Sequence, residues 1–475
     1  MSKKRSFTAN YAYNLIYEIL ILIVPLLTTP YVSRILGAKG IGDYGFTAGI
    51  VSYFGILAAT GTVNYAKREI ACKQNDVQQI NDIFWEIYII RIVSVVVVSI
   101  LYFLFIIFSN SIYKKLYIIQ FITVISWGVD ISWFFQGIED FKIITVRNSI
   151  VKILSTLLIF LLIKKQSDLW KYTLILSMAL LLGNLFAWPA VRTYIKRPRL
   201  RKLNFRRHFK GIIVMFSSVV AVQIYTVLDQ TMLGILSDTF QVAYYVQAQK
   251  IIKLALTIIS AMATVLLPRI AVLYSNHDKV QLDKYFCVAI DYLFILALPM
   301  CSGCILCSKE FVPLFFGNEY IPVIRLMQIL SILFVVLGAG QLCGSLLTAI
   351  DKQIQCMKAV TFGAITNFIL NCLLIKPYLA IGAAVASVIA ETIVTLYEVK
   401  IINGLFEIKY IFKSFIKYSI PTIVMDIYIV GVKMLIKNDW QLLMLEVVGG
   451  GLVYIIVLCF RKDKLIWEMV NKIKT

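Results

Sequence analysis

The chain has 475 residues, of which 60% are hydrophobic and 15% charged, and its mean hydropathy is +0.83. This composition leaves too little polar surface for a soluble globular protein, and it predicts an all-α, polytopic membrane protein. A net charge of +21 would favour nucleic acid as the partner of a soluble domain. Here the positive residues gather in connections between apolar stretches, which favours anionic membrane lipid and not nucleic acid.

Apolar stretches long enough to cross a bilayer, roughly 20 residues each, recur along the whole chain. Six precede a central basic run and eight follow it, which predicts fourteen transmembrane helices. The predicted spans are 10–33, 42–64, 83–108, 116–136, 146–163, 172–191, 212–236, 243–267, 285–307, 321–345, 358–375, 380–399, 415–436 and 441–460.

The basic run separates the sixth span from the seventh. Nine of the 19 residues from Arg192 to Lys210 are Lys or Arg, and such a cluster stays on the cytoplasmic side of a membrane. Lys and Arg are enriched in every second connection, which predicts that both termini are cytoplasmic. Arg34–Gly37 and Thr231–Gly234 are similar in sequence, which favours a parallel internal repeat. The expected regions are an N-terminal lobe with six spans (1–191), a basic cytoplasmic linker (192–211), a C-terminal lobe with six spans (212–400), and two last spans with a basic cytoplasmic tail (401–475).

No stretch carries the signature of an enzyme, a cofactor site or a metal site. The connections are too short to hold a catalytic domain, and no Gly-Lys-Ser/Thr loop for nucleotide phosphates is present. Cys301, Cys304 and Cys307 have a metal-like spacing, but they lie in an apolar stretch without His, which favours packing of small residues. His208 and His277 fall in basic loops without a nucleophile. We therefore expect a protein that is not an enzyme and uses neither metal nor nucleotide.

Short motifs spread over nearly the whole chain carry a family resemblance. They are Pro25–Gly37, Gly42–Gly45, Trp133–Gly137, Leu228–Gly234, Tyr244–Tyr245, Phe316–Tyr320 and Gly382–Ala384. In order and spacing they resemble the polysaccharide transporters of the multidrug/oligosaccharidyl-lipid/polysaccharide (MOP, MATE-like) exporter superfamily, specifically the Wzx-type flippases for O-antigen or capsule repeat units. Ala243 departs from the glycine that this family usually has before the two tyrosines, which affects only the expected local helix packing.

The resemblance implies a fold and a function. The implied fold has two six-helix lobes that face each other across a central cavity, with two additional C-terminal helices. The implied function is movement of undecaprenyl-diphosphate-linked oligosaccharide from the inner to the outer leaflet of the bacterial cytoplasmic membrane, for O-antigen, capsule or exopolysaccharide synthesis.

Cationic residues inside the spans are the expected contacts for the diphosphate, because a diphosphate cannot cross hydrocarbon without compensating charge. Lys250 and Lys253 lie deep in the eighth span, and their i,i+3 spacing places them on one face. Arg34, at the end of the first span, is the third candidate. A structural pair between Lys250 and Asp229 and an interfacial anchor at Arg34 are the alternative interpretations.

Acidic residues inside the spans are candidates for ion coupling. Glu18, Asp229 and Glu391 lie deep in predicted spans, where a carboxylate can exchange a proton or bind Na⁺ together with other oxygens. For Glu18 an inter-helix hydrogen bond is an equally good interpretation. Arg91 and Asp130 lie at similar depth in adjacent spans, which predicts a structural ion pair.

Three other functions are compatible with this pattern. A drug or cation antiporter on the same fold would use deep acids and aromatics without an excess of cations. A flippase for a lipid-linked peptidoglycan precursor would need the same cations. A scaffold within a polysaccharide polymerase complex would bind the polymerase and move no lipid.

Overall fold

The computed structural model describes residues 7–463 and 465, except 60, 75, 110, 199–202, 277 and 404–408. The side chain of Glu18 lies outside the described part, so its predicted role is not addressed by the structure. Over the described ranges the chain forms helices joined by turns, without β-strands, which confirms the all-α fold. The chain divides into two compact units, Met1–Thr231 and Met232–Thr475.

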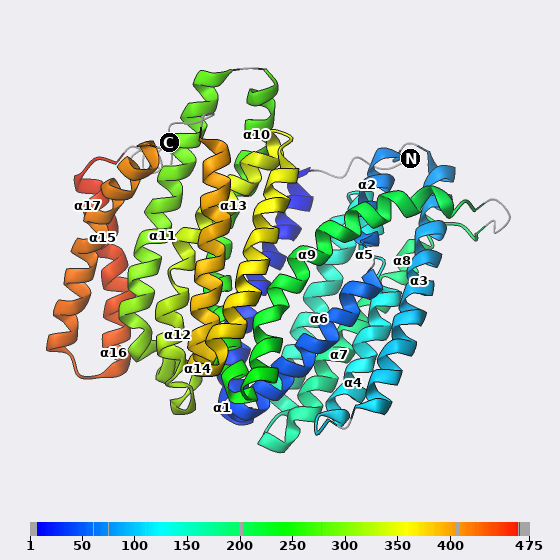
Figure 1. The fold of residues 1–475 in the computed structure, drawn as a ribbon, viewed down its shortest axis with the longest axis horizontal. Coiled ribbons are helices and arrows are strands. Elements are labelled where there is room, and N and C mark those ends of the chain that lie inside the picture. Colours follow the sequence, from blue (N-terminus) through cyan, green and yellow to red (C-terminus); the bar gives the residue numbers. More distant parts are fainter. Residues whose placement is uncertain are drawn as a thin grey trace. The chain divides into compact units, whose positions relative to one another are not determined.

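Unit 1 is a helical bundle in which α4 packs against α1, α3 and α7, and α6 packs against α1 and α7 (Figure 1). Its elements are α1 (Phe7–Ala59), α2 (Thr62–Cys72), α3 (Val77–Phe108), α4 (Lys114–Val129), α5 (Ser132–Gly137), α6 (Phe141–Leu162), the 3-10 turn η1 (Gln166–Asp168), α7 (Leu169–Phe186), α8 (Trp188–Val191) and most of α9 (Arg206–Leu236). Gly37 interrupts α1 with φ 68° and ψ 175°, a conformation that favours glycine. This break separates the first two predicted spans.

Unit 2 is a second bundle, in which α13 packs against α10, α11 and α14. Its elements are α10 (Thr239–Ser275), α11 (Lys279–Phe316), the 3-10 turn η3 (Asn318–Tyr320), α12 (Val323–Leu330), α13 (Leu333–Ala349), α14 (Gln353–Ile402), α15 (Lys409–Leu435), α16 (Asp439–Met444), the π-helical turn η4 (Leu445–Gly449) and α17 (Gly450–Phe460).

The long helix α14 is interrupted and its two halves pack together. Leu379 has φ 54° and ψ −134°, and it follows Pro377. A Cβ at Gly363 would lie 2.2 Å from Val394 Cγ2, so glycine permits the close approach of the two halves. The break separates the eleventh and twelfth predicted spans.

The helical segments match the predicted spans in number and order. Ten stretches of the described chain are long and apolar enough to cross a membrane. Two of them, Ile19–Cys72 and Gln353–Ile402, each contain two segments because of the breaks at Gly37 and Leu379. In the described part of the chain, α9 and α10 supply the remaining segments of the predicted fourteen.

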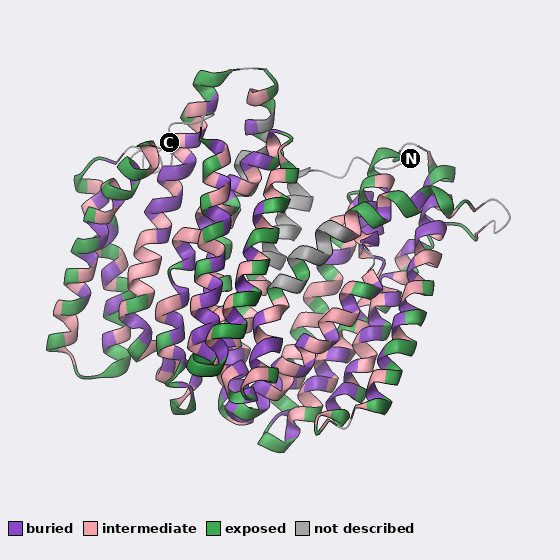
Figure 2. Ribbon diagram, viewed as in Figure 1, coloured by how far each residue is buried: buried purple, intermediate pink, exposed green. Residues whose placement is uncertain are grey.

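The outward face of α3 shows the character of a lipid-facing surface. From Val93 to Phe108 every exposed residue is apolar, including Ile100 at 56% and Phe103 at 55% exposure (Figure 2). Buried positions such as Val95 and Tyr102 alternate with them at helical spacing. A soluble protein would not expose such a surface, so the chain is a multi-pass membrane protein.

A buried charge cluster joins the first turns of α15 to α11. Lys417 Nζ lies 3.1 Å from Asp291 Oδ2 of α11 and 2.7 Å from Asp463 Oδ2, which follows α17. Ser414 and Tyr410 also donate hydrogen bonds to Asp291, at 2.5 and 3.1 Å. One lysine therefore compensates two carboxylates that burial would otherwise leave without counter-charge.

A second cluster, again of one lysine and two carboxylates, lies near the other end of α15. Lys433 Nζ is 2.8 Å from Glu310 Oε2 of α11 and 3.0 Å from Glu446 Oε1 of η4, and it donates to the Leu306 carbonyl at 2.8 Å. The Glu446 side chain is fully buried. Through these ion pairs, the two clusters link α15, η4 and the end of α17 to α11 within unit 2.

Asp168 organises the turn that precedes α7. Its Oδ2 accepts hydrogen bonds from the backbone N–H groups of Lys164 and Lys165 at 2.9 and 3.1 Å, and its Oδ1 pairs with Lys171 Nζ at 2.7 Å. The bond to Lys171, followed by the backbone bonds, lowers the pKa of Asp168 to about 2.

We expect Asp168→Asn to lower the melting temperature of the detergent-solubilised protein at neutral pH. The pKa of Asp168 in the folded state lies below its value of about 4 in the unfolded chain. Asp168 therefore stabilises the folded state fully at pH values above about 4, and this stabilisation disappears as the pH falls through about 2. The difference from wild type should therefore narrow on acidification. The exposed Asp439 provides a matched control, since Asp439→Asn should show little effect at either pH. A difference in melting temperature between wild type and Asp168→Asn that stays constant with pH would contradict the stabilising role of the Asp168 carboxylate.

Candidate functional site

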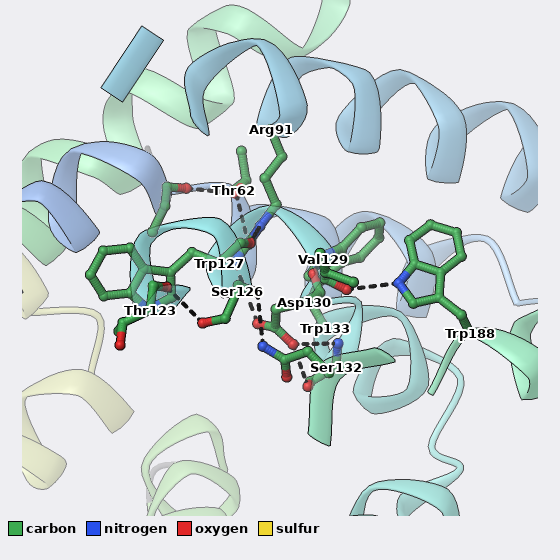
Figure 3. A network of polar contacts seen from close by, with 12 residues as sticks. Thr62, Arg91, Thr123, Ser126, Trp127, Val129, Asp130, Ser132, Trp133 and Trp188 are labelled. Atoms are coloured by element: carbon green, nitrogen blue, oxygen red, sulfur yellow. Dashed lines mark hydrogen bonds and ion pairs between the residues drawn. The ribbon is translucent and has the colours of Figure 1, made fainter. Parts of the chain in front are cut away.

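Arg91 of α3 closes the C-terminal end of α4 in unit 1. Its side chain is 2% exposed, and its Nε donates to the Trp127 carbonyl at 2.8 Å (Figure 3). Nη1 donates to Thr62 Oγ1 at 3.3 Å, and Nη2 lies 3.4 Å from Asp130 Oδ2. The last carbonyls of a helix have no partner within it, and a cation is favourable at this end of the helix dipole. The predicted ion pair between Arg91 and Asp130 is confirmed.

Side chains from three further helices satisfy other carbonyls at this helix end. The bonds are Asn184 Nδ2 to the Ser126 carbonyl at 2.9 Å, Trp188 Nε1 to the Val129 carbonyl at 2.9 Å and Trp133 Nε1 to the Asp130 carbonyl at 3.2 Å (Figure 3). These donors come from α7, α8 and α5. Four carbonyls around the break between α4 and α5 therefore accept hydrogen bonds from side chains, and the Trp133–Gly137 motif contributes to the core here.

Glu86 of α3 holds the end of the basic linker. Its carboxylate, 1% exposed, accepts from the Asn204 N–H at 2.6 Å and from Arg207 Nε at 2.8 Å, and it lies 2.6 Å from His208 Nε2. Tyr65 OH lies 2.9 Å from His208 Nδ1. Burial lowers the pKa of His208, and the contact with Glu86 opposes that shift. The expectation that His208 lies in a loop was wrong: it is buried in the first turn of α9, because Glu86 supplies a partner far away in the sequence.

A polar track in unit 2 connects α10 with the second half of α14. Lys253 Nζ donates to Gln249 Oε1 at 3.0 Å, and Gln249 Nε2 donates to Tyr245 OH at 3.3 Å. Tyr245 OH lies 2.9 Å from Ser387 Oγ. Lys253 is exposed, whereas Tyr245 is 1% exposed. The i,i+4 spacing on α10 therefore leads from an exposed ammonium group to a buried hydroxyl pair.

Two other predicted residues of unit 2 lie on the same two helices. Lys250 is half-buried on α10, three residues before Lys253. Glu391 is half-buried on the second half of α14, one turn after Ser387. Unit 2 thus holds both predicted lysines on one continuous helix.

The predicted residues of unit 1 occupy separate helices. Arg34 is exposed on α1, three residues before the break at Gly37. Asp229 is 5% exposed on α9, two residues before Thr231, whose Oγ1 lies 2.7 Å from Tyr53 OH of α1. Their roles in binding and coupling stay predictions.

Three buried polar residues of α14 are not among the residues predicted from the sequence. Asn367 and Asn371 are fully buried, and Asn371 Nδ2 donates to Asn367 Oδ1 at 3.0 Å. Glu398 is 3% exposed. Two amides one turn apart in an apolar span were a usable signal, because polar groups at membrane depth are rare without a function.

Comparisons with known proteins agree with this architecture. The family model described as polysaccharide biosynthesis protein matches residues 7–273, and the model described as lipid II flippase MurJ matches residues 145–448. A structure of the lipid II flippase MurJ in an inward closed conformation has a TM-score of 0.77 at 18% identity, covering 96% of this chain and 100% of that chain. An inward-facing multidrug transporter of the MATE family has a TM-score of 0.61 at 17% identity, covering 81% of this chain and 98% of that chain.

Two relatives are similar at the level of sequence. A Shigella dysenteriae protein named for O-antigen transport is 21% identical over 391 residues, which is 80% of this chain and 96% of the relative. A Haloferax volcanii protein named for low-salt glycan biosynthesis, a flippase, is 22% identical over 286 residues. That match spans 60% of this chain and 59% of the relative.

The fold is similar to that of the lipid II flippase MurJ and of a MATE-family transporter, and the relatives similar in sequence are named as a flippase and a transporter. The polysaccharide biosynthesis model covers more than half of the sequence. The chain therefore belongs to the polysaccharide biosynthesis protein family, which confirms the resemblance seen in its motifs.

Proposed function

We propose that the protein moves undecaprenyl-diphosphate-linked oligosaccharide repeat units from the inner to the outer leaflet of the bacterial cytoplasmic membrane. The observation that carries the proposal is the exposed Lys253 in the predicted eighth span, at the end of the polar track. An ammonium group at membrane depth is costly unless it meets water or an anion, and a diphosphate is a suitable anion. The relatives named for O-antigen transport and glycan flipping support this substrate class.

Lys250, Lys253 and Arg34 are the proposed contacts of the diphosphate. Lysine provides a mobile point charge and arginine a planar fork that binds phosphate oxygens in pairs. The isoprenoid tail can stay in lipid, so the protein has to compensate only the charged head and the sugars.

Alternating access between the regions 1–191 and 212–400 is the proposed transport cycle, with H⁺ or Na⁺ as the coupling ion. Asp229, Glu391 and Glu18 are the proposed carboxylates for that ion. Both termini and the basic linker face the cytoplasm in this scheme, where the linker meets anionic lipid. The translocated unit is then available to a polysaccharide polymerase.

A flippase for a lipid-linked peptidoglycan precursor is the second candidate. It is favoured by the MurJ family model, which matches residues 145–448. The two candidates differ in the consequence of gene deletion, because peptidoglycan synthesis is required for viability.

Deletion of the gene in its native host tests both candidates. Undecaprenyl-linked oligosaccharides would be extracted and weighed by mass spectrometry, and their leaflet would be probed with a glycosidase that cannot cross the membrane. Accumulation of a complete repeat unit, protected from the glycosidase, is the expected result. Accumulation of a peptidoglycan precursor with loss of viability would favour the second candidate, and unchanged lipid-linked sugars would refute both.

A further inference from the structure

Glu398 is a buried carboxyl group without a cationic partner among the described residues. It lies near the end of α14, it is 3% exposed, and none of the ion pairs found in the described ranges includes it. Its Oε2 has no hydrogen-bond partner there, and its Oε1 lies 3.3 Å from Cys356 Sγ in the first half of α14. This distinguishes Glu398 from Asp291, which is also buried but pairs with Lys417.

The surrounding helices leave room for this carboxyl group. Gly340 and Gly344 of α13 have the small-xxx-small spacing that lets helices approach closely in membranes. A Cβ at Gly344 would lie 3.3 Å from Glu398 Oε1, and one at Gly340 would lie 2.8 Å from Thr395 Oγ1 and 3.8 Å from Glu398 Oε2. Larger residues on α13 would therefore crowd the carboxyl group.

The neighbouring groups suit a proton better than a metal cation. The titratable groups that face Glu398 in the described part of the chain are Cys343 of α13, with Cys356 and Glu391 of α14, and none of them is a cation. Thr395 Oγ1 donates its hydrogen to the Val336 carbonyl at 3.0 Å. Hard cations such as Na⁺ need several oxygen ligands, which a thiol and one hydroxyl do not provide. A carboxyl group in such surroundings is favoured in its neutral form.

We infer that Glu398 is a proton-binding site between α13 and the two halves of α14. The step is simple: the carboxyl O–H bond breaks, the proton passes to water and a carboxylate remains, and the reverse step reloads the site. This part of the inference rests on the proposed function: the proton is the ion whose binding and release drive the transport cycle. Glu398 is then a further coupling carboxylate, seven residues after Glu391 on the same half of α14.

Infrared spectroscopy of the purified full-length protein tests the proton site independently of transport. At neutral pH the wild type should show the C=O stretching band of a protonated carboxyl group, shifted in deuterium oxide. Glu398→Gln should remove that band and Glu398→Asp should shift it. Asp291→Asn is the matched control and should leave the band intact, because Asp291 forms an ion pair with Lys417.

The same spectrum in wild type and in Glu398→Gln would overturn the inference. If Glu398→Gln fails to fold, Cys356→Ala provides a second test, because removal of the thiol at 3.3 Å should shift the band.

A transport measurement separates the coupling role from the proposed function. Cells with Glu398→Gln should deliver repeat units to the outer leaflet at a rate that no longer responds to a protonophore, whereas wild-type delivery should fall. If the band belongs to Glu398 but both proteins respond equally, the coupling role is wrong and the proton site stands. If deletion of the gene leaves lipid-linked sugars unchanged, the proposed function itself is wrong.

Discussion

Replacement of Arg91 by methionine is expected to destabilise the protein by about 3–5 kcal/mol, the range for removing one partner of a buried ion pair. Methionine has a similar length but cannot donate hydrogen bonds. The Trp127 carbonyl, Thr62 Oγ1 and the Asp130 carboxylate would all lose their contact with the guanidinium group. The measurement is the melting temperature of the detergent-solubilised protein, together with its monodispersity in size-exclusion chromatography.

Two further variants make this test specific. Arg206→Met removes an exposed arginine at the start of α9 and should leave the melting temperature nearly unchanged. Asp130→Asn combined with Arg91→Met should recover part of the loss, because the partly buried carboxylate that Arg91 no longer compensates is gone. Equal melting temperatures for Arg91→Met and Arg206→Met would refute the capping role of Arg91.

Alanine at both Lys250 and Lys253 is expected to abolish export of the polysaccharide. A hydrogen bond to a charged group contributes about 1.5–3 kcal/mol, so loss of both ammonium groups should weaken binding of a diphosphate by at least about a hundredfold. The measurement is the amount of surface polysaccharide, normalised to the amount of the protein in the membrane.

Matched variants separate loss of charge from loss of structure. Lys437→Ala removes an exposed lysine outside the polar track and should leave export intact. Lys253→Arg keeps the positive charge and should retain part of the activity. Full export with alanine at both positions would show that these lysines do not bind the substrate.

Much of the fold could be predicted from local properties of the sequence. Apolar stretches of span length gave the order of the helices, and breaks near Gly37 and before Ala380 were visible as interruptions of those stretches. Arg91 and Asp130 could be paired because each is an isolated charge at similar depth in adjacent spans. Their pairing needs only the expectation that neighbouring spans pack together.

Contacts between distant segments could not be predicted from local properties of the sequence. Glu86 and His208 are separated by more than a hundred residues, and hydropathy places His208 in a loop because its neighbours are basic. Glu398 was missed because its proximity to the end of a span suggests contact with water. Its carboxyl group is buried because Cys356, in the distant first half of α14, and Gly344 of α13 lie beside it.

The two lysine clusters of α15 predict that the C-terminal helices and the acids of α11 are retained or lost together. Lys417 and Lys433 compensate the negative charges of Asp291 and Glu310. A chain that ended before α15 would therefore leave two acids without a positively charged partner. Relatives that lack these helices should therefore carry neutral residues at the corresponding positions of α11. In relatives that retain them, each lysine and its acids should change together.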